Sequence, residues 1–125
     1  MTVRVVVADD SQTILTLVAF ALRREGYESE TATNGEEALE RIREHRPDLV
    51  ILDGVMPKLT GYDVCRALRD DPDGPHPYVI MLTAGGQEAD RNRAAEVGVD
   101  EFLTKPFRPS DLRARVREIL DTPRD

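Results

Sequence analysis

Residues 3–10 read VRVVVADD, a short run rich in β-branched apolar residues that ends in two carboxylates. A run without strict apolar–polar alternation is typical of a strand covered on both faces, as in a parallel sheet. Three further runs follow the same plan: DLVILD at 48–53, YVIMLT at 78–83 and EFLTKP at 101–106. The four stretches therefore predict buried strands that carry chemical groups at their carboxyl ends.

Stretches with apolar residues at helical spacing lie between these runs, and glycine or proline often closes them. We expect strands over 3–8, 27–32, 49–52, 78–82 and 101–104, and helices over 11–25, 36–45, 62–69, 87–97 and 109–120. Alternation of strand and helix with short connections predicts an α/β fold, with a doubly wound parallel sheet of five strands and right-handed crossovers. We expect one domain over 1–121, and a polar tail or the start of a linker over 122–125.

The composition is that of an ordinary globular protein, with 40% hydrophobic and 33% charged residues. A formal net charge of −7 argues against broad binding to nucleic acid or to anionic membranes. The single cysteine, Cys65, excludes an internal disulfide and a thiolate metal cluster. No apolar stretch approaches the roughly 20 residues that span a bilayer, and the N-terminus lacks the plan of a signal peptide. We therefore expect a cytoplasmic protein.

Polar residues stand at the carboxyl ends of the expected strands. They are Asp9, Asp10, Asp53, Thr83 and Lys105. Because the carboxyl ends of parallel strands form the ligand crevice of an open α/β sheet, we expect these side chains to meet in one pocket. Three carboxylates and one ammonium give that pocket a charge of about −2, which a divalent cation would neutralise. The oxygen donors favour Mg²⁺, with Ca²⁺ and Mn²⁺ as alternatives that the sequence does not separate.

Asp53 is the expected nucleophile, because it stands alone at a strand end opposite the acidic pair. A carboxylate can accept a phosphoryl group, in a reaction that depends mainly on electrostatic stabilisation of the phosphoryl oxygens. Lys105 would supply positive charge, and the Thr83 hydroxyl and the Ala84 amide would donate hydrogen bonds to those oxygens.

Four motifs, VVADDS, DLVILDGVMPKLTG, MLTA and FLTKPF, occur in this order over almost the full chain. Together they make the sequence similar to the receiver domains of response regulators in two-component signalling. The resemblance implies a flavodoxin-like three-layer sandwich with strand order 2-1-3-4-5. It also implies a signalling switch without turnover of an external substrate. In such a switch, Asp53 accepts a phosphoryl group from a histidine kinase or a phosphotransfer protein and slowly loses it again.

The same resemblance implies a set of metal ligands. Asp10 and Asp53 would bind Mg²⁺, Asp9 would hold metal-bound water, and the backbone carbonyl of Val55 would complete the coordination. One neighbouring position departs from the family pattern: residue 54 is usually bulky and apolar, and here it is Gly54. We expect one side of the pocket to be open at residue 54, because glycine has no side chain to cover it.

Thr83 and Phe102 fall at the switch positions of the family, and the bond between Lys105 and Pro106 is expected to be cis. Phosphorylation adds a charge of about −1.5 to −2, which Thr83 and Lys105 can meet only by moving. The movement of Thr83 vacates space for Phe102, so the surface of the fourth helix, fifth strand and fifth helix changes. A downstream effector protein or domain would bind that surface.

The stretch FLTKPFRPSDLRARVREIL resembles receivers attached to winged-helix transcription factors, which dimerise through the fourth helix, fifth strand and fifth helix. A homodimer of that kind would pair Arg91 with Asp111, and Glu101 with Arg115. Two other charge positions of that group are not matched, so the set of ion pairs is incomplete.

Other functions stay open on the sequence alone. A flavodoxin-like cofactor binder would share the fold, but two carboxylates follow the first strand where such a binder needs a phosphate loop. An aspartyl-phosphate hydrolase would want a general acid or base beside Asp53, where Gly54 and Val55 stand. The remaining alternatives are a scaffold that acts without phosphorylation and a regulatory fragment of a longer DNA-binding or enzymatic response regulator.

Each site residue also has a purely structural interpretation. Asp9 and Asp10 could cap the first helix, Thr83 could simply end a strand, and Lys105 could be a solvated loop charge. Tyr62, on the third helix, fits a packing position.

Overall fold

The computed structural model describes residues 3–83 and 98–121, which contain one sheet of five parallel strands. The strands are β1 (Val5–Ala8), β2 (Ser29–Ala32), β3 (Leu49–Asp53), β4 (Tyr78–Thr83) and β5 (Glu101–Thr104). Their spatial order is β2-β1-β3-β4-β5, and every pair is parallel. The predicted fold class and strand order are therefore confirmed.

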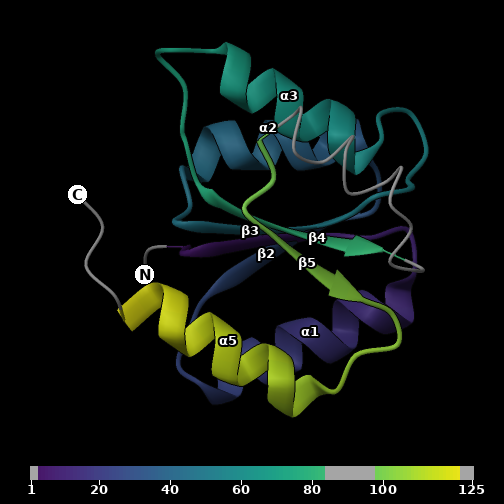
Figure 1. Cartoon of the computed structure of the whole chain (residues 1–125), viewed down its shortest axis with the longest axis vertical. Helices are drawn as coiled ribbons and strands as arrows, with labels where there is room; N and C mark the ends of the chain where they lie inside the picture. Colours follow the sequence, from purple (N-terminus) through teal and green to yellow (C-terminus); the bar gives the residue numbers. More distant parts are fainter. Residues whose placement is uncertain (1–2, 84–97, 122–125) are drawn as a thin grey trace.

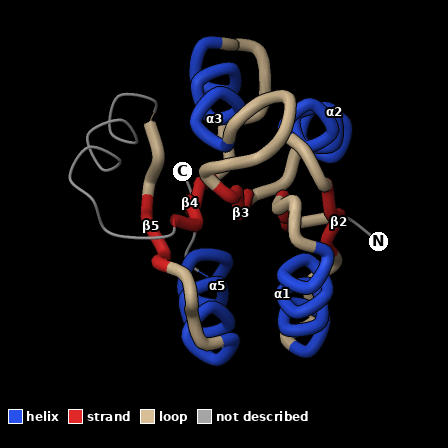
Figure 2. The backbone as a smooth tube through the Cα atoms, turned by 90° about the vertical axis from the view of Figure 1, so that its right-hand side faces the viewer, coloured by secondary structure: helices blue, strands red, loops and turns tan. Residues whose placement is uncertain are grey.

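Helices cover both faces of the sheet. The described helices are α1 (Gln12–Arg24), α2 (Gly35–His45), α3 (Gly61–Asp70) and α5 (Pro109–Asp121). Figure 1 shows α1 and α5 on one face and α2 and α3 on the other, and the turned view in Figure 2 shows the same three layers. The helix expected over 87–97 lies outside the described residues.

The central strands are buried on both faces, which explains why their sequences do not alternate. In β1, Val5 and Val7 belong to the core beneath α1 and α5, whereas Val6 and Ala8 belong to the core beneath α2 and α3. All four residues have no exposed surface. Because successive side chains point to opposite faces of a strand, each central strand contributes to two hydrophobic cores.

Some strand boundaries differ from the prediction for local reasons. The strand expected from residue 27 begins only at Ser29, because the backbone N–H of Tyr27 donates to the carbonyl of Leu22 at the end of α1, at 3.0 Å. The Tyr27 ring packs against the core of α1 and α5. In contrast, β3 and β4 each extend one residue further than predicted, so Asp53 and Thr83 are the last residues of their strands.

The loop that follows β3 is seated on the first turn of α2. The N–H of Gly35 donates to the carbonyl of Pro57 at 3.3 Å. A Cβ atom built on Gly35 would lie 2.0 Å from the carbonyl oxygen of Leu59 and 2.5 Å from its Cβ. Only glycine therefore fits this contact, and it fixes where the chain runs after Asp53.

An ion pair within the chain joins β5 to α5. The Nε of Arg115 donates to both carboxylate oxygens of Glu101, at 2.6 and 2.7 Å. The hydroxyl of Tyr78 donates to the same carboxylate at 2.9 Å and accepts from Arg115 at 3.1 Å. Glu101 and Arg115 are thus paired inside one chain, and their pairing across a homodimer remains a prediction. Arg91, the expected partner of Asp111, lies outside the described residues.

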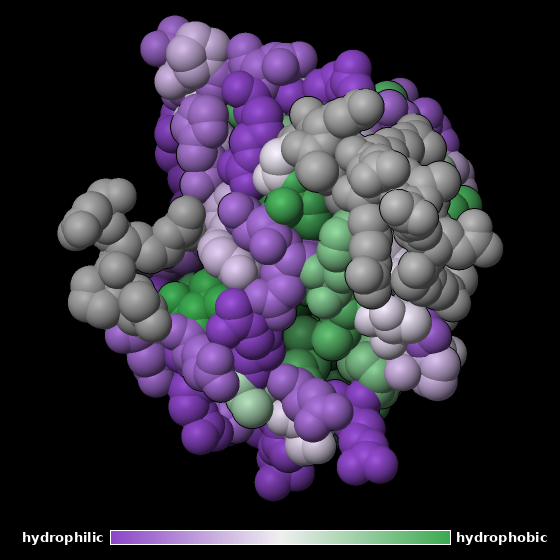
Figure 3. All heavy atoms as spheres, in the orientation of Figure 1, coloured by the Kyte–Doolittle hydropathy of each residue, from purple (hydrophilic) through white to green (hydrophobic). Residues whose placement is uncertain are grey.

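Figure 3 shows that the face viewed in Figure 1 is mostly polar, with an apolar area where β5 lies. Phe102 and Leu103 of β5 are half-buried and pack against opposite cores. Within residues 3–83 and 98–121, no helix has the length and the apolar character needed to cross a lipid bilayer.

We predict that Gly35→Ala lowers the free energy of unfolding by about 1–3 kcal/mol, because the added methyl group overlaps the backbone of Leu59. Urea denaturation measures the loss. Glu40→Ala is the control, since Glu40 is an exposed residue of the same helix. A Gly35→Ala variant as stable as the wild type would show that the loop is not seated as described.

We predict that Glu101→Gln lowers the free energy of unfolding by about 1 kcal/mol near pH 7. Burial alone would raise the pKa of Glu101, but the hydrogen bonds from Arg115 and Tyr78 outweigh it and lower the pKa. A carboxylate with a lowered pKa contributes stability above about pH 4.3, and this contribution is lost as the pH falls through the folded-state pKa. The difference between wild type and variant should therefore shrink on acidification.

Urea denaturation from pH 7 down to about pH 2 follows this difference. Glu118→Gln is the matched control, because Glu118 also pairs with Arg115, at 2.9 Å, but is largely exposed. We expect a smaller loss for that variant. A gap between wild type and Glu101→Gln that grows as the pH falls would contradict the assignment.

Candidate functional site

Asp9 and Asp10 follow β1 directly, and the structure gives them different environments. Asp9 is fully buried, whereas Asp10 is exposed. The N–H of Asp9 donates to the carbonyl of Ala32, and its Oδ1 accepts from the N–H of Ser11 at 2.9 Å. The N-cap of α1 is Ser11, whose Oγ accepts from the N–H of Ile14. The helix is therefore capped without either aspartate serving as its N-cap residue.

Asp53 is the last residue of β3, and its carboxylate is almost fully enclosed, with 8% of the residue exposed. Its Oδ1 accepts a hydrogen bond from the N–H of Val55 at 3.2 Å. Its Oδ2 lies 3.4 Å from the ammonium nitrogen of Lys105. One carboxylate oxygen is thus held by the following loop and the other faces a cation.

Lys105 reaches the site from the loop after β5. Its backbone N–H donates to the carbonyl of Thr83 at 2.7 Å, and the Lys105–Pro106 bond is cis. Its ammonium nitrogen lies 2.9 Å from Oδ2 of Asp9, in addition to its contact with Asp53. The contact with Asp9 is an ion pair without hydrogen-bond geometry, because this buried oxygen makes no hydrogen bond to the described residues.

The three carboxylates converge at the carboxyl ends of β1 and β3. Asp9, Asp10 and Asp53 each offer an oxygen, and these oxygens lie within 4.8 Å of one another. Burial raises the pKa of Asp53, and the charge of Asp9 raises it further, although Val55 N–H and Lys105 oppose the shift. The site therefore holds more negative charge than Lys105 alone compensates.

The pKa of Lys105 moves in the direction that keeps its ammonium charged. Burial would lower this pKa, but the carboxylates of Asp9 and Asp53 outweigh burial and raise it. Lys105 therefore remains a cation at the point where the two buried carboxylates meet.

The predicted switch residues lie on neighbouring strands, Thr83 at the end of β4 and Phe102 opposite Met81 on β5. Thr83 ends β4 and is 7% exposed, and its carbonyl accepts from Lys105. Phe102 is half-buried and packs against the core beneath α2 and α3. Ala84, the expected donor after Thr83, lies outside the described residues. Val55 is 76% exposed and stands at the mouth of the site.

The side of the site next to Gly54 is not open, contrary to the expectation from sequence. A Cβ atom built on Gly54 would lie 3.1 Å from Cε2 of Tyr62 and 3.5 Å from its hydroxyl oxygen. Tyr62 is only 5% exposed, so its ring fills the space that a side chain at residue 54 would take. The available signal was a large aromatic residue eight positions after the glycine, but spacing alone does not reveal where a ring points.

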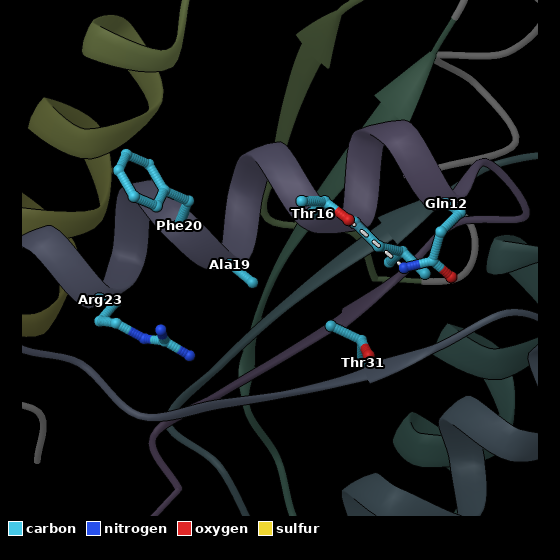
Figure 4. A pocket seen from close by; sticks show the side chains of 7 residues that line it. Gln12, Thr16, Ala19, Phe20, Arg23 and Thr31 are labelled. Atoms are coloured by element: carbon cyan, nitrogen blue, oxygen red, sulfur yellow. Dashed lines mark hydrogen bonds between the residues drawn. The ribbon is translucent and has the colours of Figure 1, made fainter.

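A second hollow, of about 290 Å³, lies between α1 and β2, away from the carboxylates (Figure 4). Its lining residues are Gln12, Leu15, Thr16, Ala19, Phe20, Arg23 and Thr31. The amide of Gln12 donates to the hydroxyl of Thr16 at 3.4 Å, as the dashed line shows. No carboxylate lines this hollow, so it is separate from the acidic cluster at the strand ends.

Comparison with known proteins gives consistent matches. The profile of the response regulator receiver domain matches residues 5–117. A probable transcriptional regulator ycf27 of Porphyra purpurea is 46% identical over 117 residues, which cover 94% of this chain and 47% of that protein. The alkaline phosphatase synthesis transcriptional regulatory protein PhoP of Bacillus subtilis is 42% identical over 124 residues, which cover 96% of this chain and 49% of that protein.

Among solved structures, the chemotaxis protein CheY4 of Vibrio cholerae matches with a TM-score of 0.86 and 32% sequence identity, covering 95% of this chain and 99% of that chain. In contrast, this chain spans about half the length of the two curated relatives named above. The profile, the sequence identities and the shared fold agree: the chain belongs to the response regulator receiver domains of two-component signalling.

Proposed function

We propose that Asp53 is the phosphoacceptor of this receiver domain. The observation that carries the proposal is the position of its carboxylate, which is enclosed between Lys105, the N–H of Val55 and the other two acidic residues. Its Oδ2 faces the one lysine that also contacts Asp9. A carboxylate in this setting can act as a nucleophile toward phosphorus.

The donor set fits a divalent cation. Three carboxylate oxygens lie within 4.8 Å of one another, and the buried Oδ2 of Asp9 makes no hydrogen bond in the described part of the chain. We propose that Asp9, Asp10, Asp53 and the carbonyl of Val55 hold Mg²⁺, directly or through water. When bound, the ion neutralises charge on the phosphoryl oxygens.

The transfer itself would need little more from the protein. An oxygen of Asp53 forms a bond to phosphorus while the bond between phosphorus and the imidazole nitrogen of the donor histidine breaks. The imidazole keeps the electron pair and takes up a proton. Lys105, the Thr83 hydroxyl and the Ala84 amide would stabilise the phosphoryl oxygens.

The output would be a change in the surface near β5. Thr83 moves toward the phosphoryl group, and Phe102 fills the space that it leaves. A histidine kinase or a phosphotransfer protein is the proposed input, an effector protein or domain the proposed reader, and the cytoplasm the proposed compartment. Glu101 and Arg115 pair inside the chain, so this ion pair would have to break before the two residues could pair across a homodimer.

We predict that incubation with acetyl phosphate and Mg²⁺ adds one phosphoryl group, detected by intact mass. The adduct should be absent in Asp53→Asn and in wild type treated with EDTA. Glu40→Gln removes the same charge from an exposed position of α2 and should be phosphorylated like the wild type. An adduct that persists in Asp53→Asn would place the phosphoacceptor elsewhere, and no adduct on folded wild type would favour a scaffold that acts without phosphorylation.

We predict that Asp53→Asn stabilises the metal-free protein by about 1 kcal/mol near pH 7. The folded-state pKa of Asp53 is raised, mainly by burial, so its charged form at neutral pH opposes folding. Urea denaturation in EDTA measures the change, with Glu40→Gln as the control. Adding Mg²⁺ should then stabilise the wild type more than Asp53→Asn. A less stable Asp53→Asn variant with an unchanged Mg²⁺ response would contradict both assignments.

A further inference from the structure

Gly54 directly follows β3, and Thr83 is the last residue of the adjacent strand β4. Asp53 pairs with Leu82 in the register of β3 and β4, and the N–H of Gly54 donates to the carbonyl of Leu82 at 3.0 Å. One residue further along, Gly54 therefore lies beside Thr83. By the alternation of the strands, both positions lie on the face of the sheet that packs against α2 and α3, as Leu52 and Met81 do.

Neighbouring strands lie about 4.8 Å apart, so a side chain at residue 54 would normally pack against the side chain at residue 83. Gly54 has no such side chain, yet the residue is buried. The ring of Tyr62 occupies this place, 3.1 Å from the position of the missing Cβ. We infer from this register that the group beside Thr83 on this side comes from α3 and not from residue 54.

The backbone holds Tyr62 at a fixed place relative to Asp53. The preceding residue, Gly61, donates its N–H to the carbonyl of Gly54 at 3.3 Å. A Cβ atom on Gly61 would lie 2.3 Å from the carbonyl oxygen of Asp53, so the start of α3 touches the phosphoacceptor's own backbone. Thr60 and Asp63 cap the same turn reciprocally, at 3.1 Å each. The position of the Tyr62 backbone is thus tied to that of Asp53.

We propose that Tyr62 is a positioning residue for Thr83, and that its ring replaces the missing side chain of residue 54. The proposal rests on the proposed function, in which the Thr83 hydroxyl donates to the phosphoryl group on Asp53. Threonine has more than one accessible staggered χ1 rotamer, and the side chains packed around it help to select one of them. Without the ring, Thr83 gains a void beside it, and its hydroxyl is no longer directed to one place.

The experiment compares Tyr62→Ala, Gly54→Leu and the double variant. Gly54 has no positive φ, so its backbone does not oppose a larger side chain, and in Tyr62→Ala the ring that would crowd that side chain is gone. We expect Tyr62→Ala to slow phosphorylation by acetyl phosphate at saturating Mg²⁺ by about tenfold, because a small misplacement of a reacting group is costly. Adding Gly54→Leu to Tyr62→Ala should restore the rate to within about threefold of wild type, since the leucine refills the same space.

Two controls separate positioning from a general loss of packing. Val64→Ala removes volume from a fully buried residue of the same helix and core, and it should lower stability without changing the rate. Tyr62→Phe keeps the ring and should stay within about threefold of the wild-type rate. A further readout needs no phosphorylation: the methyl NMR signal of Thr83, assigned with Thr83→Ser, should shift in Tyr62→Ala and return toward its place in the double variant.

A wild-type rate in folded Tyr62→Ala, or no recovery in the double variant, would overturn the proposal. If Tyr62→Ala does not fold, Tyr62→Leu takes its place in the same comparison. If wild type itself is not phosphorylated, the proposed function fails. The Thr83 methyl signal and the free energies of unfolding of wild type, the two single variants and the double variant still test whether residues 54 and 62 share one space. If they do, the effects of the two substitutions on stability are not additive.

Discussion

The contact of the Lys105 ammonium with Asp9 and Asp53 is the interaction on which the site depends. Asp9 is fully buried and Asp53 nearly so, and buried carboxylates are tolerated only when a cation or hydrogen-bond donors compensate them. Lys105 is a residue of the loop after β5, two strands away from β3 in the sheet. The ends of β1, β3, β4 and β5 must therefore be in register before this cation can reach both acids. The charge balance of the site is therefore reached only when the strands have the correct register.

This requirement explains why much of the fold and of the site could be predicted from sequence. Buried parallel strands need apolar runs, and the crevice at their carboxyl ends needs polar residues directly after those runs. Asp53 and Thr83 meet both conditions, because each ends a strand and lies at the crevice. The apolar runs and the polar groups at their ends thus identify the same positions. The strand order was predicted from the resemblance to receiver domains, which rests on the order of the motifs along the chain.

Contacts between side chains from distant elements could not be predicted in the same way. Glu101 and Arg115 were considered only as partners across a possible homodimer, and the sequence did not show that they pair within one chain, where β5 and α5 lie close enough for the guanidinium to reach. Tyr62 was recognised as a packing residue, but the direction of its ring depends on the turn that seats α3 against Asp53. Spacing along the chain identifies the face of a helix, whereas rotamers and the close approach of two backbones decide which atoms meet.

The double burial of the central strands has a consequence for how the domain can evolve. Leu82 packs toward α1 and α5, whereas the next residue, Thr83, faces the layer of α2 and α3 together with Phe102. Two adjacent residues at the end of β4 therefore face different hydrophobic cores, one on each side of the sheet. Substitutions that adapt the α1 and α5 layer to one partner leave the residues around Thr83 and Phe102 largely untouched. Because the sheet separates the two cores, the residues on each face can diverge in sequence while the carboxylates at the carboxyl ends of the strands stay the same.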